Sequence, residues 1–145
     1  MEICKIDQNN VLEILKIDNE IFDYDKYSLE TLNDFISDDN YVNLCAKIDN
    51  KVVGYIIVFN IFDEGCLIKI AICPKYQKMG IASKLFNFAK NELLKRNVNQ
   101  IYLEVSSKND TAINFYNKKG FITESTRKSY YSNGDDALIM WLRDF

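Results

Sequence analysis

The spacing of apolar residues changes along this chain, and the changes predict helices and strands in a defined order. Apolar residues recur every three or four positions after Asn9–Asn10 and again after Ser28, polar residues that can cap a helix. Tyr41–Ile48 and Val52–Phe62 are instead rich in β-branched and aromatic residues, and the polar turn Asp49–Lys51 separates them. Two strands joined by a tight turn are therefore predicted, as in a hairpin.

The second half of the chain repeats the same two patterns. A strand is predicted over about Cys66–Cys73 and ends at Pro74, because proline cannot donate a hydrogen bond to a ladder. A long amphipathic helix, about Gly80–Arg96, and a strand, Ile101–Ser106, follow. The last predicted elements are a short helix capped by Asn109 and ending near Gly120, and two strands, about Phe121–Ser129 and Asp136–Leu142.

This order of elements predicts an α/β domain with a mixed sheet. The chain has no repeat, low-complexity tract or linker-like stretch, so we expect residues 1–145 to form one domain. Several folds share this order of elements, so the order alone does not decide the function.

Charge and apolar content exclude several classes of function. The net charge of −3 argues against general nucleic-acid binding, which favours a basic face. The longest apolar run, Val52–Phe62, contains Asn60 and is too short to span a membrane, and the first residues lack a signal-peptide pattern. We expect a cytoplasmic protein, a monomer or weak dimer, that binds neither nucleic acid directly nor a membrane.

The histidine and cysteine content limits the catalytic chemistry. The chain has no His, which excludes Ser–His and Cys–His pairs and leaves Asp, Glu, Lys, Tyr or Cys as the general base. None of the four cysteines has Cys-x-x-Cys spacing, so we predict no metal site and reduced thiols. These residues are Cys4, Cys45, Cys66 and Cys73.

The segment Gln77–Ala82 opens the long helix directly after a predicted strand and a short turn. Gly80 would let a phosphate approach the backbone, where the first-turn amides and the helix dipole favour an anion. Lys75, Lys78 and Lys84 add positive charge nearby. A single glycine at the start of a helix is more often structural, so this segment alone does not establish a phosphate site.

Glu104 and Tyr116 are the second group of candidate residues. Glu104 interrupts an apolar strand, where a carboxylate is costly unless it is exposed, paired or functional. If Leu103 and Val105 face the core, Glu104 points to the opposite side of the sheet. Tyr116 lies among apolar neighbours on the next helix, where either a core residue or a catalytic acid fits.

Together these segments resemble the GNAT superfamily of acetyl-CoA-dependent N-acetyltransferases. The Gln/Arg-x-x-Gly-x-Gly/Ala loop of that family is matched by Gln77, Gly80 and Ala82. Its Asn-x-x-Ala-x-x-x-Tyr-x-x-x-Gly-Phe pattern is matched by Asn109, Ala112, Tyr116, Gly120 and Phe121. The resemblance implies the GNAT fold, a central mixed, mostly antiparallel sheet that is flanked by helices and splayed at the cofactor cleft.

The resemblance also implies roles for individual residues. Glu104 would be the general base, directly or through a water, and Tyr116 the general acid in a direct acetyl transfer from acetyl-CoA. No metal is implied. The Ile72 amide would bind the developing oxyanion, and Asn109 would contact the pantetheine or support that wall of the cleft. The expected cofactor contacts are Ile70, Ala71, Ile72, Gln77, Lys78, Met79, Gly80, Ile81, Ala82, Asn109 and Tyr116.

A narrower resemblance is to the ribosomal-protein-alanine N-acetyltransferase (RimI) group. It rests on Ala71–Gln77, Tyr102–Val105 and Asp135–Met140, and on Tyr27–Glu30, where Tyr replaces the Trp of a Trp-Ser-x-Glu element. The implied acceptor is the N-terminal α-amine of a protein or peptide, possibly an alanine-starting ribosomal protein S18-like substrate. The expected peptide contacts are Tyr27, Glu30, Tyr130 and Tyr131.

Two other functions stay open at this stage. The chain could be a GNAT enzyme that acetylates a small-molecule amine, or a catalytically silent module that binds coenzyme A. Retention of both Glu104 and Tyr116 argues against the silent module. A route through an acetylated Cys73 is disfavoured, because the chain has no His to generate the thiolate.

Overall fold

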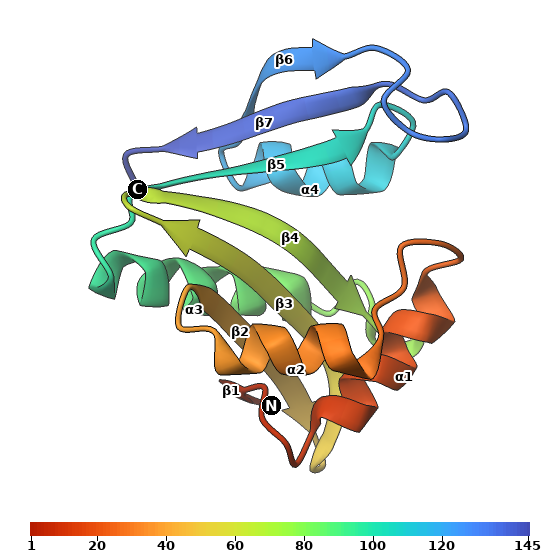
Figure 1. The fold of residues 1–145 in the computed structure, drawn as a ribbon, viewed down its shortest axis with the longest axis vertical. Helices are drawn as coiled ribbons and strands as arrows, with labels where there is room; N and C mark the ends of the chain where they lie inside the picture. The colour runs from red at the N-terminus through yellow and green to blue at the C-terminus, as the bar shows by residue number, and fades with distance from the viewer.

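The computed structural model describes residues 1–145 and contains one seven-stranded sheet flanked by helices (Figure 1). The helices are α1 (Val11–Ile21), α2 (Leu29–Ser37), α3 (Ile81–Lys95) and α4 (Asp110–Lys118), and a short 3-10 helix, η1 (Pro74–Tyr76), precedes α3. The strands are β1 (Glu2–Lys5), β2 (Tyr41–Ile48), β3 (Lys51–Ile61), β4 (Glu64–Ile72), β5 (Gln100–Ser106), β6 (Ile122–Arg127) and β7 (Ala137–Arg143).

The sheet is mixed and mostly antiparallel, as predicted. Its strand order is β1-β2-β3-β4-β5-β7-β6, and the β4–β5 pair alone is parallel. Pairing between β4 and β5 runs only from Glu64–Gln100 to Cys66–Tyr102, and beyond this point the two strands separate (Figure 1). This separation is the predicted splay of the sheet, and it leaves the end of β4 paired with β3 alone, with its other edge open.

Both faces of the sheet are covered at β3, which explains why this strand is an almost continuous apolar run. Val53, Ile56 and Val58 pack in a core with α3 and Tyr116 of α4. On the opposite face, Tyr55 and Ile57 pack in a second core with α1 and α2. A strand that is buried on both faces needs apolar residues at successive positions. No helix of the structure is long and apolar enough to cross a membrane.

Most predicted turns and caps are confirmed. The Ser28 side chain accepts a hydrogen bond from the Thr31 amide at the start of α2, and Asn109 caps α4 in the same way. Asp49 and Asn50 both have positive φ, 50° and 66°, as a two-residue hairpin turn of type I′ requires.

Asn9 or Asn10 was predicted to cap the first helix; Asn10 occupies the N-cap position of α1 but forms no side-chain cap, and one strand was missed. The Asn10 side chain makes no cap to α1 and instead accepts from the Asp7 amide and donates to the Lys5 carbonyl, at 2.9 and 3.1 Å. These bonds fix the turn between β1 and α1. The short edge strand β1 pairs only with β2, and its few residues carry no clear alternation from which it could have been predicted.

Candidate active site

The loop between β4 and α3 presents a row of free backbone donors. The first hydrogen bond of α3 runs from the Lys84 amide to the Gly80 carbonyl (3.2 Å), and the amides of Lys78–Ser83 donate to no acceptor within the chain. Amides at the start of a helix, together with the helix dipole, favour the binding of a phosphate group. Lys75, Lys78 and Lys84 surround this loop, and all three are exposed.

Backbone conformation explains the glycine in this loop. Gly80 has φ +80° and Lys78 has φ +63°, so the chain passes twice through the left-handed region before α3 begins. A Cβ atom at Gly80 would meet no atom within 4 Å. The glycine is therefore required by its φ rather than by crowding, and the space beside it is open to a ligand.

The Gln77 side chain holds the loop against the end of β4. Its side-chain amide donates to the Ile72 carbonyl at 3.0 Å, which ties the loop to the end of β4. Met79 is exposed, whereas Ile81, the first residue of α3, is buried in the core. In this segment the backbone amides are free to donate, the Gln77 side chain holds the loop to β4, and the Ile81 side chain packs in the core.

The edge of β4 turns backbone amides toward the opening in the sheet. The Cys73 amide donates to the Val53 carbonyl of β3 at 2.8 Å. Because amides alternate in direction along a strand, those of Ile72 and Ile70 point to the other side, where β5 has already separated. Ala71 and Ile72 have buried side chains on opposite faces of the sheet.

Glu104 lies on the face of β5 opposite the core, as the alternation predicted. Leu103 and Val105 are buried, whereas the Glu104 side chain is 28% exposed. Its carboxylate lies 3.8 Å from the Arg127 guanidinium of β6, a residue that the sequence analysis did not single out. The candidate base is therefore partly shielded from solvent and has one cationic neighbour.

A cleft of about 600 Å³ opens beside Glu104. It brings Glu104 together with Tyr130 and Tyr131, an adjacent pair of predicted site residues that lies far from Glu104 in the chain. The Glu104 carboxylate raises the pKa of Tyr130, first as a hydrogen-bond acceptor and then through its charge. Burial, followed by the charge of Glu104, raises the pKa of Tyr131. The cleft is lined by Tyr24, Asp25, Cys66, Leu67, Ile68, Glu104, Tyr130, Tyr131 and Ser132.

Two aspartates shape the loop that carries the tyrosine pair. The Asp136 carboxylate accepts from the Ser129 amide at 2.9 Å and binds Lys128 at 3.1 Å. The Asp135 carbonyl accepts from the Tyr131 amide, and its carboxylate accepts from the Ser106 hydroxyl of β5. These contacts tie the loop to the strand that carries Glu104.

Tyr116 is buried on α4 and does not line this cleft. Its ring packs edge-on against Phe115 and Phe121, each with a centroid distance of 5.5 Å. Burial raises the pKa of Tyr116 to about 12, so the hydroxyl keeps its proton at neutral pH. Asn109, at the start of the same helix, uses its side chain for the cap to the Ala112 amide.

Tyr27 and Glu30, predicted as peptide contacts, do not line the cleft either. The Tyr27 ring lies over the Lys69 ammonium, and its buried hydroxyl has no partner in the chain. Glu30 is exposed on α2. Tyr24 and Asp25, which precede the predicted element Tyr27–Glu30 in the chain, line the cleft instead.

Cys73 shows no sign of activation as a nucleophile. Burial, followed by the charge of Glu20, raises the pKa of its thiol, which disfavours the thiolate. No group of three or more His, Cys, Asp or Glu side chains is arranged to hold a metal ion.

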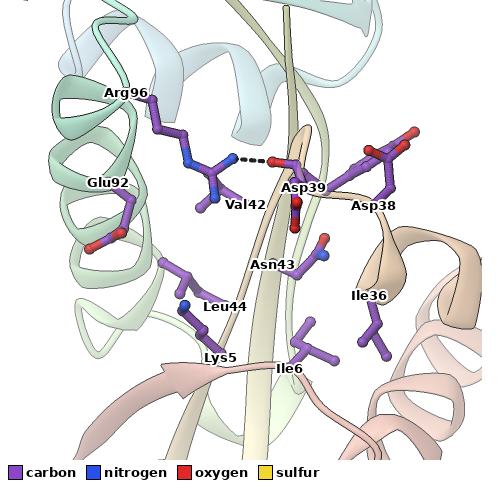
Figure 2. A pocket seen from close by; sticks show the side chains of 11 residues that line it. Lys5, Ile6, Ile36, Asp38, Asp39, Val42, Asn43, Leu44, Glu92 and Arg96 are labelled. Atoms are coloured by element: carbon purple, nitrogen blue, oxygen red, sulfur yellow. Dashed lines mark hydrogen bonds between the residues drawn. The ribbon is translucent and has the colours of Figure 1, made fainter.

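A smaller hollow of about 130 Å³ lies elsewhere, between α3, β2 and the end of α2 (Figure 2). It contains the acidic residues Asp38, Asp39 and Glu92, and Arg96 donates to the Asp39 carbonyl at 2.7 Å. None of the predicted site residues lines it. The candidate site is therefore the cleft at Glu104 together with the loop before α3.

The sequence of this chain is similar to those of known acetyltransferases. The sequence pattern of the acetyltransferase (GNAT) family matches residues 9–121. The chain is 35% identical, over 107 residues, to the [ribosomal protein bS18]-alanine N-acetyltransferase of Escherichia coli K12. The aligned region covers 72% of each chain.

Two solved structures extend the likeness to the whole fold. The ribosomal-protein-S18-alanine N-acetyltransferase from Escherichia coli superposes with a TM-score of 0.89 at 28% identity, covering 99% of this chain and 93% of that one. A PaiA N-acetyltransferase from Thermoplasma acidophilum, in complex with coenzyme A, gives 0.84 at 22% identity over 98% of both chains.

Proposed function

The chain belongs to the acetyltransferase (GNAT) family, and we propose that this N-acetyltransferase moves an acetyl group from acetyl-CoA to the N-terminal α-amine of a protein. The observation that carries the proposal is the cleft in which Glu104, Tyr130 and Tyr131 meet beside the open edge of β4. The likeness to an enzyme named for the alanine of ribosomal protein bS18 supports an alanine-starting, S18-like protein as acceptor. We also propose that residues 1–145 act as one domain, because both cores share the same sheet.

The donor site is supported by the free amides of Lys78–Ser83. These amides and the three nearby lysines would hold the pyrophosphate of acetyl-CoA, which supplies the activated acetyl group when bound. Gly80 leaves room for a phosphate, and Gln77 keeps the loop in place. The Ile72 amide would donate to the acetyl carbonyl oxygen as negative charge develops on it.

Glu104 would take a proton from the acceptor amine, directly or through a water, and Tyr116 would give one to the departing sulfur. An ammonium has no lone pair, so proton removal must precede attack. An α-amine has a pKa of about 7.7–8.0 and a lysine side chain about 10.4, a difference of roughly 3–4 kcal/mol in the cost of that step. A carboxylate base therefore suits the α-amine better.

A second candidate function is the acetylation of a small amine. Asp25 and Glu104 both line the cleft, and two carboxylates would also attract a small polycation. The cleft is open enough for either acceptor. A coenzyme-A-binding module without activity is the third possibility, and Glu104 at the cleft argues against it.

The test uses three acceptors with acetyl-CoA: an alanine-starting peptide, the same peptide with a blocked N-terminus and an internal lysine, and spermidine. We expect one acetyl group on the α-amine of the free peptide, located by fragmentation mass spectrometry, and none on the blocked peptide. Turnover of spermidine without turnover of any peptide would establish the second candidate instead. Absence of turnover with all three acceptors, despite coenzyme A binding, would favour the silent module.

A further inference from the structure

Lys69 is a buried lysine in the middle of β4. Only 6% of its surface is exposed, and its neighbours in the strand, Ile68 and Ile70, are apolar. A buried ammonium is costly unless a partner compensates its charge. Its partner is Asp18, near the end of α1: the Lys69 Nζ lies 2.8 Å from Asp18 Oδ1, and Asp18 is itself fully buried.

The Asp18 carboxylate accepts two further hydrogen bonds, from donors in different parts of the chain. The Tyr55 hydroxyl of β3 donates to its Oδ1 at 2.5 Å, and the Tyr27 backbone amide donates to its Oδ2 at 2.6 Å. Burial, followed by the hydrogen bond to Asp18, raises the pKa of Tyr55, so this hydroxyl stays a donor. The carboxylate thus joins α1, β3 and β4 to the segment that follows α1.

The Lys69 ammonium is enclosed by that same segment, residues 22–28. It donates to the Asp25 carbonyl, and it lies over the rings of Phe22 and Tyr27, 4.0 and 3.9 Å from their centroids. Contacts of this kind between a desolvated cation and aromatic rings are attractive. Asp25 has φ +74°, an uncommon conformation for a residue other than glycine, and the bond to its carbonyl holds it there.

Asp25 and Tyr24 are also the residues through which this segment reaches the cleft at Glu104. We propose that Lys69, paired with Asp18, is a positioning residue for the acceptor: it holds residues 22–28 where Tyr24 and Asp25 form a wall of the acceptor cleft. This inference rests on the proposed function, in which the acceptor binds in that cleft. The Lys69 ammonium makes no hydrogen bond or ion pair with the loop before α3, so acetyl-CoA binding should not depend on it.

The decisive variant removes both charges. Lys69→Met alone would leave Asp18 buried without a counter-charge, which is strongly destabilising, whereas Asp18→Asn with Lys69→Met keeps the volume and leaves no unpaired charge. In this double variant we expect the KM for the acceptor peptide to rise about tenfold and the KM for acetyl-CoA to change less than about twofold. Lys51→Met, at an exposed position at the start of β3, is the matched control and should change neither value.

Trypsin cleavage after Lys26 reports on the segment without any acceptor. Lys26 lies within residues 22–28, so release of the segment should speed cleavage there about tenfold in the double variant and leave it unchanged in the control. This readout stays informative even if no peptide is acetylated, so failure of the proposed function and failure of this inference are distinguishable. A folded double variant with wild-type cleavage and wild-type acceptor KM overturns the inference.

Hydrogen exchange of the wild-type protein tests the same point if the double variant does not fold. The Tyr27 amide donates to the buried Asp18, whereas the Lys78 amide has no acceptor in the chain. We expect the Tyr27 amide to exchange at least about a hundredfold more slowly than the Lys78 amide. Equal exchange rates would mean that Asp18 and Lys69 do not hold the segment.

Discussion

Glu104 is the residue on which the proposed chemistry depends most directly. Glu104→Gln keeps the size of the side chain but removes its ability to take a proton, so we expect kcat to fall about a hundredfold or more, as for the loss of a general base. The KM for acetyl-CoA should stay within about twofold, since Glu104 lies outside the loop before α3. Steady-state kinetics with Glu124→Gln as control, on β6 and paired with Arg143, measure both effects. An unchanged kcat in Glu104→Gln would remove this residue from the mechanism.

The effects of Tyr116 on stability and on catalysis can be separated, because its hydroxyl has no hydrogen bond within the chain. Tyr116→Phe should therefore leave thermal stability nearly unchanged while it lowers kcat by about tenfold to a hundredfold. Burial disfavours the charged phenolate and raises the pKa of Tyr116 to about 12, so the acid stays protonated well above neutral pH. A loss of stability with no loss of kcat would assign Tyr116 to the core alone.

Single residues were predictable from the sequence where local rules determine them. The alternation of Leu103, Glu104 and Val105 determines which way the carboxylate points, and the cap formed by Asn109 needs only its own helix. The pair of Lys69 with Asp18 is different, since 51 positions separate the two residues. A lysine within the apolar strand Cys66–Ile72 was a visible signal, but its partner depends on how α1 packs on β4.

At the scale of elements, the loop and helix start at Gly80 form the proposed donor site. Gly80→Ala would force φ +80° on a residue with a Cβ, at a cost of about 1–2 kcal/mol, although the Cβ itself meets no atom within 4 Å. The loop should relax to another conformation and lose its amide geometry, so we expect the KM for acetyl-CoA to rise about tenfold. Steady-state titration of acetyl-CoA at saturating acceptor checks this value.

Gly134→Ala is the matched control for that substitution. Gly134 has φ +89° and equally open surroundings, but it lies in the loop of the tyrosine pair. It should carry the same strain and leave the KM for acetyl-CoA unchanged. A similar rise in both variants would mean that strain, rather than loss of the phosphate site, causes the effect.

The elements themselves were largely predictable from local patterns, whereas their arrangement could be expected only from the family resemblance. Helix caps, the apolar strand β3 and the stop at Pro74 follow from local physics. The placement of β7 between β5 and β6 depends on pairing between distant segments, and so does the early end of the β4–β5 ladder at Cys66. Cys66, Leu67 and Ile68 line the cleft because of that early end, so periodicity alone could not identify them.

At the scale of the whole molecule, the net charge is −3, but positive and negative groups lie in different regions of the surface. Exposed lysines and free amides lie at the loop before α3, whereas Asp25 and Glu104 line the proposed acceptor cleft. A chain with this arrangement should bind an anionic donor and a cationic acceptor at adjacent sites. The donor half can be tested without any knowledge of the acceptor.

Coenzyme A should raise the thermal stability of the whole chain by mass action. A ligand at about a hundred times its Kd stabilises the folded state by about 2.7 kcal/mol, which corresponds to roughly a 10 °C rise in Tm for a chain of this length. Pantetheine lacks the pyrophosphate, so at the same concentration it should raise Tm far less. Calorimetry of the wild-type protein and of Gly80→Ala with each compound compares these shifts. If pantetheine stabilises the protein as much as coenzyme A does, the free amides of Lys78–Ser83 do not bind the pyrophosphate, and the donor site must be sought elsewhere.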